Sequence, residues 1–153
     1  MMKQYHRIIF VGRSGTCREP MAMGITKDCF LTEEIEVLAR GLIVSFPEPM
    51  NQKAEAILIS NGINMTGFVS EQLSEEDIIK DTLILTMEQG QKERVLNQCK
   101  NISMDDVYVL TEFVGDELEI IDPYGGTLQA YGLCYETLRK TIKKLVKLLN
   151  GAE

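Results

Sequence analysis

Residues 7–22 read RIIFVGRSGTCREPMA, and this stretch says more about the fold than any other. After Arg7, the next four residues are apolar and mostly branched, which is typical of a strand buried on both faces of a parallel sheet. The run stops at Gly12 and small polar residues follow. Pro20 then stands in the first turn of a helix, a place that proline favours. The stretch therefore predicts a buried strand that leads through a tight loop into a helix. That helix would extend to about residue 30 and bury Met21, Ile25 and Phe30.

The rest of the chain repeats this alternation of apolar strands and helices. Strands that alternate with helices predict a parallel sheet covered on both faces and joined by right-handed crossovers. We therefore expect an α/β fold, a three-layer α/β/α sandwich built on a four-stranded parallel sheet. The expected strands are residues 7–11, 36–44, 82–87 and 106–110, and the expected helices are residues 20–30, 52–60, 89–99 and 128–149, with a further helix start at Ser74.

The segment 128–149 has the clearest pattern. Apolar residues recur there at alternating steps of three and four positions, and basic residues lie on the opposite side. This predicts one long amphipathic helix laid on the sheet, with its basic end favourable to the helix dipole. A coiled coil is the alternative, but about three heptads in a compact domain favour a helix that faces the core. The apolar residues are Leu128, Tyr131, Tyr135, Leu138, Ile142, Leu145 and Leu149, and the basic ones are Arg139, Lys140, Lys143, Lys144 and Lys147.

Composition excludes several classes of protein. The chain has 153 residues, 44% hydrophobic and 25% charged, which fits a single domain over residues 1–153 and excludes intrinsic disorder. It lacks both an apolar run long enough for a membrane span and a signal-peptide pattern, so we expect a cytoplasmic protein. The net charge of −7 argues against nucleic acid and anionic lipid as partners. One histidine and four scattered cysteines form no metal-binding pattern, so we expect no metal, no cofactor and a reduced monomer.

The loop at residues 12–19 is the first place to look for chemistry. In parallel α/β sheets, ligands bind at the carboxyl ends of the strands. A loop of small residues can point successive backbone N–H groups into a concavity, and a helix N-terminus behind it completes an anion site. The loop lacks the Gly-Lys-Ser/Thr ending of a nucleotide-binding P-loop. By itself, a glycine-rich loop of this kind fits a simple tight turn equally well.

Two motifs in this order resemble the low-molecular-weight protein tyrosine phosphatase family. The segment FVGRSGTCREPMA, residues 10–22, is similar to its signature, in which a cysteine, five residues and an arginine are followed by serine and proline. Asp122-Pro123 resembles the acid loop before the last helix, and residues 61–63 and 81–88 resemble the middle of the family. The likeness covers residues 7–148. It implies the fold of that family, in which a cysteine thiolate attacks phosphotyrosine while loop amides and the arginine hold the phosphate.

The resemblance assigns roles by position. Arg18 stands at the phosphate clamp, Asp122 at the general acid and Gly12 at the nucleophile. Because glycine has no side chain, the covalent intermediate of the family cannot form there. Cys17 does not replace it, since a shifted frame would put Met23 in place of the arginine, and we interpret Cys17 as a small buried thiol. The implied phosphate-binding loop is Arg13, Ser14, Gly15, Thr16, Cys17 and Arg18, and Phe46 and Tyr124 are candidate walls of the cleft.

Glu19 stands where the family has the serine that stabilises the thiolate. A carboxylate about 4 Å from a phosphate would cost roughly 4 kcal/mol per unit of phosphate charge at an effective dielectric constant of 20. One arginine–phosphate contact contributes roughly 1.5–3 kcal/mol, so repulsion is the larger effect unless Glu19 points away. The alternative is an ordinary acid in the first turn of a helix. Ser14 and Gly15 also replace the usual glycine and the asparagine that braces the loop.

These departures favour a catalytically inactive pseudophosphatase that serves as a binding or regulatory module, with a phosphoprotein or a tyrosine kinase/phosphatase system as its partner. The alternative is an active phosphotyrosine phosphatase or another phosphoester hydrolase that uses Asp122 and Arg18 without a cysteine. Asp122 is equally compatible with a turn residue before Pro123. We further hypothesise that the loop is plugged from within: Arg18 pairs with a carboxylate of its own chain, Glu19 or Asp122, and free phosphate binds weakly or not at all.

Overall fold

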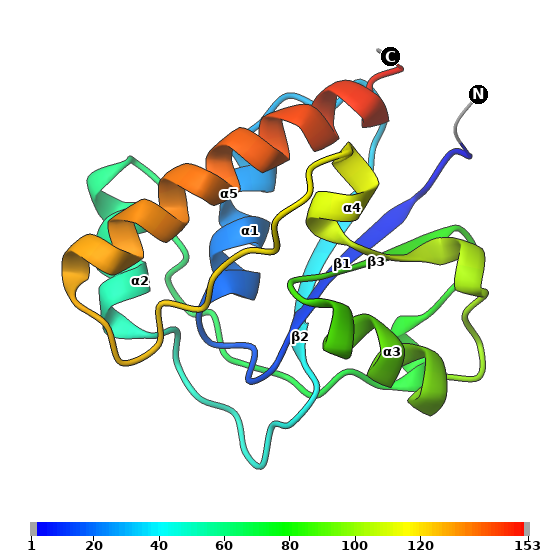
Figure 1. The fold of residues 1–153 in the computed structure, drawn as a ribbon, viewed down its shortest axis with the longest axis horizontal. Coiled ribbons are helices and arrows are strands. Elements are labelled where there is room, and N and C mark those ends of the chain that lie inside the picture. Colours follow the sequence, from blue (N-terminus) through cyan, green and yellow to red (C-terminus); the bar gives the residue numbers. More distant parts are fainter. Residues whose placement is uncertain (1–2, 152–153) are drawn as a thin grey trace.

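The computed structural model describes residues 3–151 and has a four-stranded parallel sheet at its centre (Figure 1). The strands are β1 (Arg7–Gly12), β2 (Glu36–Gly41), β3 (Thr82–Thr86) and β4 (Val107–Val109). They lie in the order β2-β1-β3-β4, and every neighbouring pair is parallel. In the register, Ile9 of the central strand faces Leu38 on one side and Ile84 on the other.

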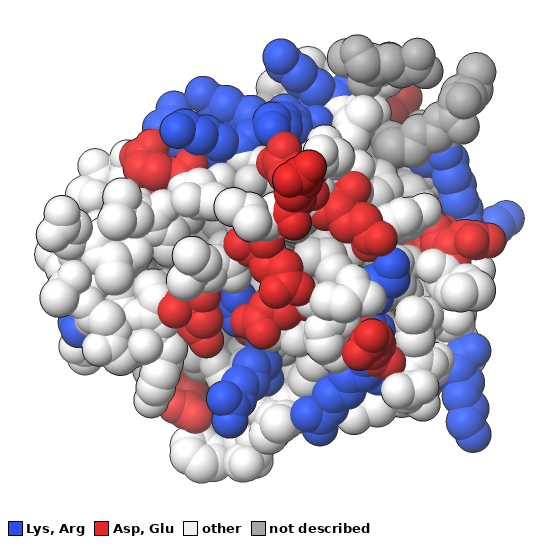
Figure 2. Space-filling model, in the orientation of Figure 1, with Lys and Arg blue, Asp and Glu red and all other residues white. Residues whose placement is uncertain are grey.

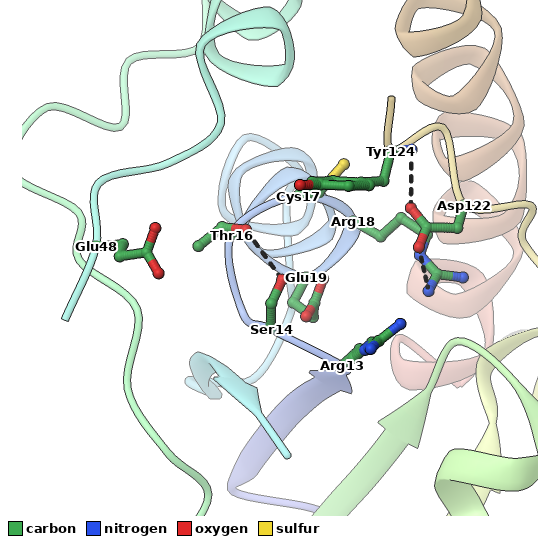
Figure 3. Close-up of a pocket in the computed structure, with 9 residues that line it drawn as sticks. All are labelled: Arg13, Ser14, Thr16, Cys17, Arg18, Glu19, Glu48, Asp122 and Tyr124. Atoms are coloured by element: carbon green, nitrogen blue, oxygen red, sulfur yellow. Dashed lines mark hydrogen bonds and ion pairs between the residues drawn. The ribbon is translucent and has the colours of Figure 1, made fainter. Parts of the chain in front are cut away.

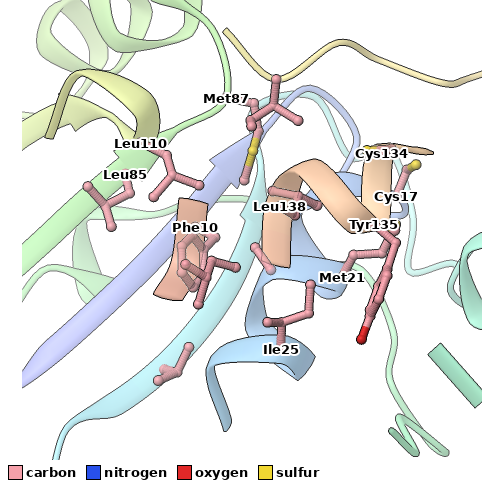
Figure 4. Packing of buried hydrophobic residues seen from close by; sticks show 14 of the residues in the cluster. Phe10, Cys17, Met21, Ile25, Leu85, Met87, Leu110, Cys134, Tyr135 and Leu138 are labelled. Carbon is pink, nitrogen blue, oxygen red and sulfur yellow. The ribbon is translucent and has the colours of Figure 1, made fainter. Parts of the chain in front are cut away.

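Helices cover both faces of the sheet, which confirms the predicted three-layer α/β sandwich. They are α1 (Arg18–Lys27), α2 (Gln52–Ser60), α3 (Gln89–Gln98), α4 (Leu110–Val114) and α5 (Leu128–Leu149). Side chains of β1 alternate between two cores, as the period of a strand requires. Ile8 and Phe10 belong to the larger core with α1, α2 and α5 (Figure 4), whereas Ile9 and Val11 pack with Val95 of α3 on the other face.

Helix α5 has the amphipathic face that its spacing predicted. Leu138, Ile142 and Leu145 are fully buried against the sheet layer, while Lys and Arg side chains gather along the outer side of the helix (Figure 2). Leu128 is an exception and is half exposed, because the first turns of α5 extend past the sheet (Figure 1). Within residues 3–151, no helix is both long and apolar enough to cross a membrane.

The first predicted helix was misplaced at both ends. Helix α1 begins at Arg18, before Pro20, because N–H groups in the first turn have no intrahelical partner and proline there loses no hydrogen bond. It ends at Lys27, so the prediction that Phe30 is buried was wrong: Phe30 is 79% exposed. Strand β2 also ends early, at Gly41 instead of residue 44, where the chain passes closely against Ser14.

Two short segments were also predicted incorrectly. The strand expected at residues 106–110 is only Val107–Val109, and Leu110 begins the unpredicted helix α4, which is too short to show a helical period. The helix expected after Ser74 is a single 3₁₀ turn, Glu75–Asp77, because Ile78 already has an extended backbone. The remaining predicted elements match the structure to within one residue at each end.

Candidate functional site

A cleft of about 340 Å³ opens at the carboxyl end of β1 (Figure 3). Three segments far apart in the sequence form it: the loop between β1 and α1, the loop after β2, and the loop before α5. The predicted clamp Arg18 and the predicted acid Asp122 meet there, together with the predicted wall Tyr124. The other predicted wall, Phe46, is exposed and does not line the cleft. The full lining is Arg13, Ser14, Thr16, Cys17, Arg18, Glu19, Glu48, Asp122 and Tyr124.

The loop after β1 is held against the end of β2. The N–H of Leu42 donates to the carbonyl of Gly12 at 2.9 Å, and the N–H of Ile43 donates to the carbonyl of Arg13 at 2.9 Å. Gly15 has φ of 77°, a conformation that glycine adopts without strain. A Cβ atom on Gly41 would lie 2.6 Å from the carbonyl carbon of Ser14. Close packing of the two backbones therefore requires glycine at positions 15 and 41.

The Glu19 side chain fills the centre of this loop. A Cβ atom built on Gly12 would lie 2.3 Å from Cδ and 2.4 Å from Oε2 of Glu19. The Oε2 atom also accepts a hydrogen bond from Gly15 N at 2.6 Å. Glu19 is 2% exposed, so the carboxylate occupies the interior of the loop and does not point to solvent. A side chain at position 12 and the observed Glu19 rotamer exclude each other.

Burial raises the pKa of the Glu19 carboxyl above its usual range, because a desolvated carboxylate is costly. Asp122 raises this pKa further by like charge. Three favourable contacts oppose the shift: the N–H of Glu19 itself, the N–H of Gly15 and the charge of Arg18. The net rise shows that these contacts do not offset the loss of water.

Arg18 is buried and does not pair with Glu19. Its Nη1 donates to the carbonyl of Ile120 at 2.7 Å. Its Nη2 lies 2.7 Å from Oε2 of Glu88. The same nitrogen lies 3.7 Å from Oδ2 of Asp122, as drawn in Figure 3. The guanidinium is thus held by carboxylates of its own chain, one of them the predicted Asp122 and the other, Glu88, not predicted.

Asp122 has two contacts, one with the backbone of its own loop and one with Arg18. Its Oδ1 accepts from the N–H of Tyr124 at 3.0 Å, the bond of a turn residue before a proline. Its Oδ2 faces Arg18 in the cleft. The side chain is 40% exposed, so it remains accessible to a molecule in the cleft.

Cys17 and Cys134 approach each other behind the loop (Figure 4). Burial strongly raises the pKa of the Cys17 thiol and raises that of Cys134 to about 11. Neither thiol is ionised near neutral pH, and a neutral thiol is a weak nucleophile. The structure therefore places Cys17 as the small buried thiol that its sequence position suggested.

Two carboxylates of the site had no assigned role in the sequence. Glu88 is the last residue of segment 81–88, which resembles the family but contains no residue with a predicted role. It caps the N-terminus of α3 and lies beside Arg18. Glu48 lies in an irregular loop that has no periodicity to reveal its direction, and it faces the cleft from the side opposite Asp122 (Figure 3). Among residues 3–151, no group of three or more His, Cys, Asp or Glu side chains is arranged to hold a metal ion.

A model of the low molecular weight phosphotyrosine protein phosphatase family matches residues 7–152 of the chain. The chain belongs to this phosphatase family. A curated relative, the low molecular weight protein-tyrosine-phosphatase PtpB of Staphylococcus aureus, is 32% identical over 143 residues, which cover 94% of this chain and 99% of the relative. The protein-arginine-phosphatase of Geobacillus stearothermophilus is 30% identical over 145 residues, covering 94% of this chain and 96% of the relative.

Solved structures of phosphatases in this family have the same fold. The low molecular weight protein tyrosine phosphatase of T. tengcongensis superposes with a TM-score of 0.87 at 32% identity, covering 94% of this chain and 99% of that chain. The predicted fold and family are thereby confirmed, and the relatives support a phosphatase-like function. Residues 10–22, which resemble the family signature, include the loop after β1. The side chain of Glu19 fills this loop.

Proposed function

We propose that this member of the low molecular weight phosphatase family is a catalytically inactive pseudophosphatase that serves as a binding module. The observation that carries the proposal is the position of the Glu19 carboxylate, 2.3 Å from where a Cβ on Gly12 would be. The loop has no side chain at position 12 to attack phosphorus, and a carboxylate stands in that space. The internal plug differs in part from the one expected from the sequence: Glu19 accepts the amide of Gly15 instead of pairing with Arg18, and Arg18 pairs with Asp122, as expected, and with Glu88, which was not expected.

The contacts of the loop disfavour phosphate for two reasons. The N–H of Gly15, which would face an anion, already donates to Glu19. The guanidinium of Arg18 already contacts Glu88 and Asp122. A phosphate entering the cleft would have to displace these intramolecular partners, which are present at high effective concentration. It would also come close to Glu19, and repulsion by the ionised carboxylate exceeds the gain from one arginine contact.

Hydrolysis and phosphate binding test this proposal together. The relatives are named as tyrosine and arginine phosphatases, so para-nitrophenyl phosphate, a phosphotyrosine peptide and a phosphoarginine peptide are suitable substrates. We expect no turnover above buffer for any of them. Calorimetric titration with inorganic phosphate should show no binding to the native chain and measurable binding to Glu19→Ala, which frees the amide of Gly15. Glu33→Ala, in an exposed loop remote from the cleft, is the matched control.

An alternative proposal is a hydrolase in which Asp122 activates water next to Arg18. It is favoured by the exposure of the Asp122 carboxylate 3.7 Å from the guanidinium, in an open cleft. Turnover that survives purification and is lost in Asp122→Ala would establish this alternative and overturn the pseudophosphatase proposal. Turnover that persists in Asp122→Ala would point to a contaminating phosphatase.

A further inference from the structure

We propose that the cleft binds a basic side chain, lysine or arginine, carried by an unphosphorylated segment of a partner protein. The inference rests on the proposed function, because it takes the loop closed by Glu19 as the working state of the module. In that state the cleft receives a cation in place of the phosphate that the fold accommodates elsewhere in the family.

The first support is a buried carboxyl group without an ion-pair partner, which a nearby cation would hold in its ionised form. Glu19 is 2% exposed and lines the cleft. Within residues 3–151, no Lys, Arg or His nitrogen lies within 4.0 Å of its carboxylate oxygens. The neighbouring guanidinium of Arg18 is directed instead to Glu88 and Asp122. Because an unpaired buried charge is costly, a cation that reaches the floor of the cleft is stabilised there.

The second support is the balance of charges around the cleft. The charge of Arg18 is matched by the carboxylates of Glu88 and Asp122. The remaining charges of the lining are the carboxylates of Glu19 and Glu48 and the guanidinium of Arg13. Glu48 has no ion-pair partner among the described residues, and its carboxylate points toward the loop (Figure 3). Two carboxylates without ion-pair partners therefore oppose one exposed arginine.

The third support is the shape of the opening. The ring of Tyr124 is 78% exposed and lies over the cleft (Figure 3), where an aromatic face attracts a cation. A volume of about 340 Å³ is ample for one long side chain. Glu19 lies at the floor of the cleft, Glu48 at its side and the ring of Tyr124 at its mouth. This arrangement suits an ammonium or guanidinium group on an apolar stem.

The surface beside the mouth indicates that this side chain belongs to a polypeptide. The loop from α4 to α5 exposes three large hydrophobic side chains, Leu118, Ile121 and Tyr124, at 83%, 83% and 78%, and several apolar side chains along one loop offer a polypeptide more contact than a single one would. Acidic side chains gather along the same loop (Figure 2); they are Asp116, Glu117, Glu119 and Asp122. Charge complementarity with this loop favours a segment that carries further basic residues around the inserted one.

Peptide titrations of the full chain test the proposal. The probes are capped nine-residue peptides with a central arginine, lysine, glutamine or phosphotyrosine in one neutral host sequence. Amide shifts of Gly15 and Tyr124 and calorimetry report binding. We expect the arginine and lysine peptides to bind and to move both amides, and the glutamine and phosphotyrosine peptides to bind at least about tenfold more weakly.

Isosteric variants separate charge from shape. Glu19→Gln keeps an oxygen for the amide of Gly15, and we expect it to weaken the basic peptides about tenfold, while Glu48→Gln weakens them about two- to fivefold. Arg13→Gln removes a like charge and should strengthen them about two- to fivefold, whereas it would weaken any phosphate ligand. Glu33→Gln is the matched control and should change nothing. Melting temperatures confirm that each variant is folded.

Several results would overturn the inference. They are equal affinity for the glutamine and arginine peptides, weaker binding in Arg13→Gln, or unchanged binding in both Glu19→Gln and Glu48→Gln. These failures differ from failure of the proposed function, which would appear as turnover or as tight phosphate binding by the native chain. A chain that neither hydrolyses phosphoesters nor binds basic peptides retains the proposed function and refutes this inference alone.

Discussion

Positions 12 and 19 form one steric unit, because the Glu19 carboxylate fills the volume that any side chain at position 12 would need. The same carboxylate accepts the N–H of Gly15 and so supports the loop that Gly12 leaves unfilled. In the family signature these positions hold a cysteine and a serine. The two exchanges together remove a thiol that a neighbouring hydroxyl stabilises, and they introduce a carboxylate that accepts a hydrogen bond from the amide of Gly15. A change at either position alone would create a clash or a cavity.

The coupling predicts how activity returns. Gly12→Cys alone should hydrolyse para-nitrophenyl phosphate poorly, because the new Cβ meets Cδ of Glu19 and the carboxylate raises the pKa of the thiol by like charge. Gly12→Cys with Glu19→Ser removes both obstacles. We expect at least about tenfold faster hydrolysis from the double variant, since one pKa unit changes the thiolate fraction about tenfold. Initial rates at equal concentrations of folded protein measure the difference.

Glu19→Ser alone is the control for this pair and should be inactive, because it opens the loop without supplying a nucleophile. Equal rates from the single Gly12→Cys variant and the double variant would show that Glu19 does not oppose a thiol at position 12.

A second prediction at this scale concerns pH. Because the pKa of Glu19 is raised in the folded chain, the folded state binds its proton more tightly than the unfolded state does. This contribution to stability is fully present below the unfolded pKa and is lost as pH rises through the folded pKa. The free energy of unfolding of the native chain should therefore fall relative to Glu19→Gln as the pH rises above about 4.5, by at most about 1.4 kcal/mol per pH unit. Urea denaturation at several pH values measures it, and parallel curves for the two proteins would contradict it.

At the scale of elements, strong periodicity and apolar runs made it possible to predict helices and strands from the sequence. Helix α5 and strand β1 were located from sequence because each has a long or strongly apolar pattern set by burial. Helix α4 has five residues and no period, and the exposure of Phe30 depends on where α1 stops. Local pattern cannot show either, since tertiary contacts fix where short elements begin and end.

Helix α2 illustrates such a contact, because its N-cap also touches the loop. The side chain of Asn51 accepts from Lys53 N at 2.9 Å and Ala54 N at 3.1 Å. Its own N–H donates to the carbonyl of Thr16 at 2.8 Å. Asn51→Ala should lower the free energy of unfolding by about 1 kcal/mol through loss of the cap, as measured by urea denaturation. Asn101→Ala, at an exposed loop position, is the control, and an equal effect of both substitutions would show that the cap contributes nothing.

At the scale of the whole molecule, the site depends on contacts that no local pattern reveals. The family resemblance alone was enough to predict that Arg18 and Asp122 share one cleft. It gave no role to Glu88, whose carboxylate approaches Arg18 only because β3 lies beside β1 in the sheet. The direction of Glu19 was likewise open, because a residue in the first turn of a helix can face solvent or the loop. Burial and the amide of Gly15 decide it.

Arg18 joins three parts of the fold and gives the last prediction. Its guanidinium contacts the carbonyl of Ile120 in the loop before α5, Glu88 at the start of α3 and Asp122 in the cleft. Arg18→Ala removes these contacts and leaves a buried carbonyl and two carboxylates without their cation. We expect a loss of about 2–3 kcal/mol in the free energy of unfolding, with faster hydrogen exchange in residues 115–127 and at the start of α3. Arg13→Ala is the matched control, because Arg13 is exposed in the same loop. If both variants had equal stability and exchange, Arg18 would not be what holds the loop before α5 over the cleft, and the acidic surface beside Tyr124 would owe its position to other contacts.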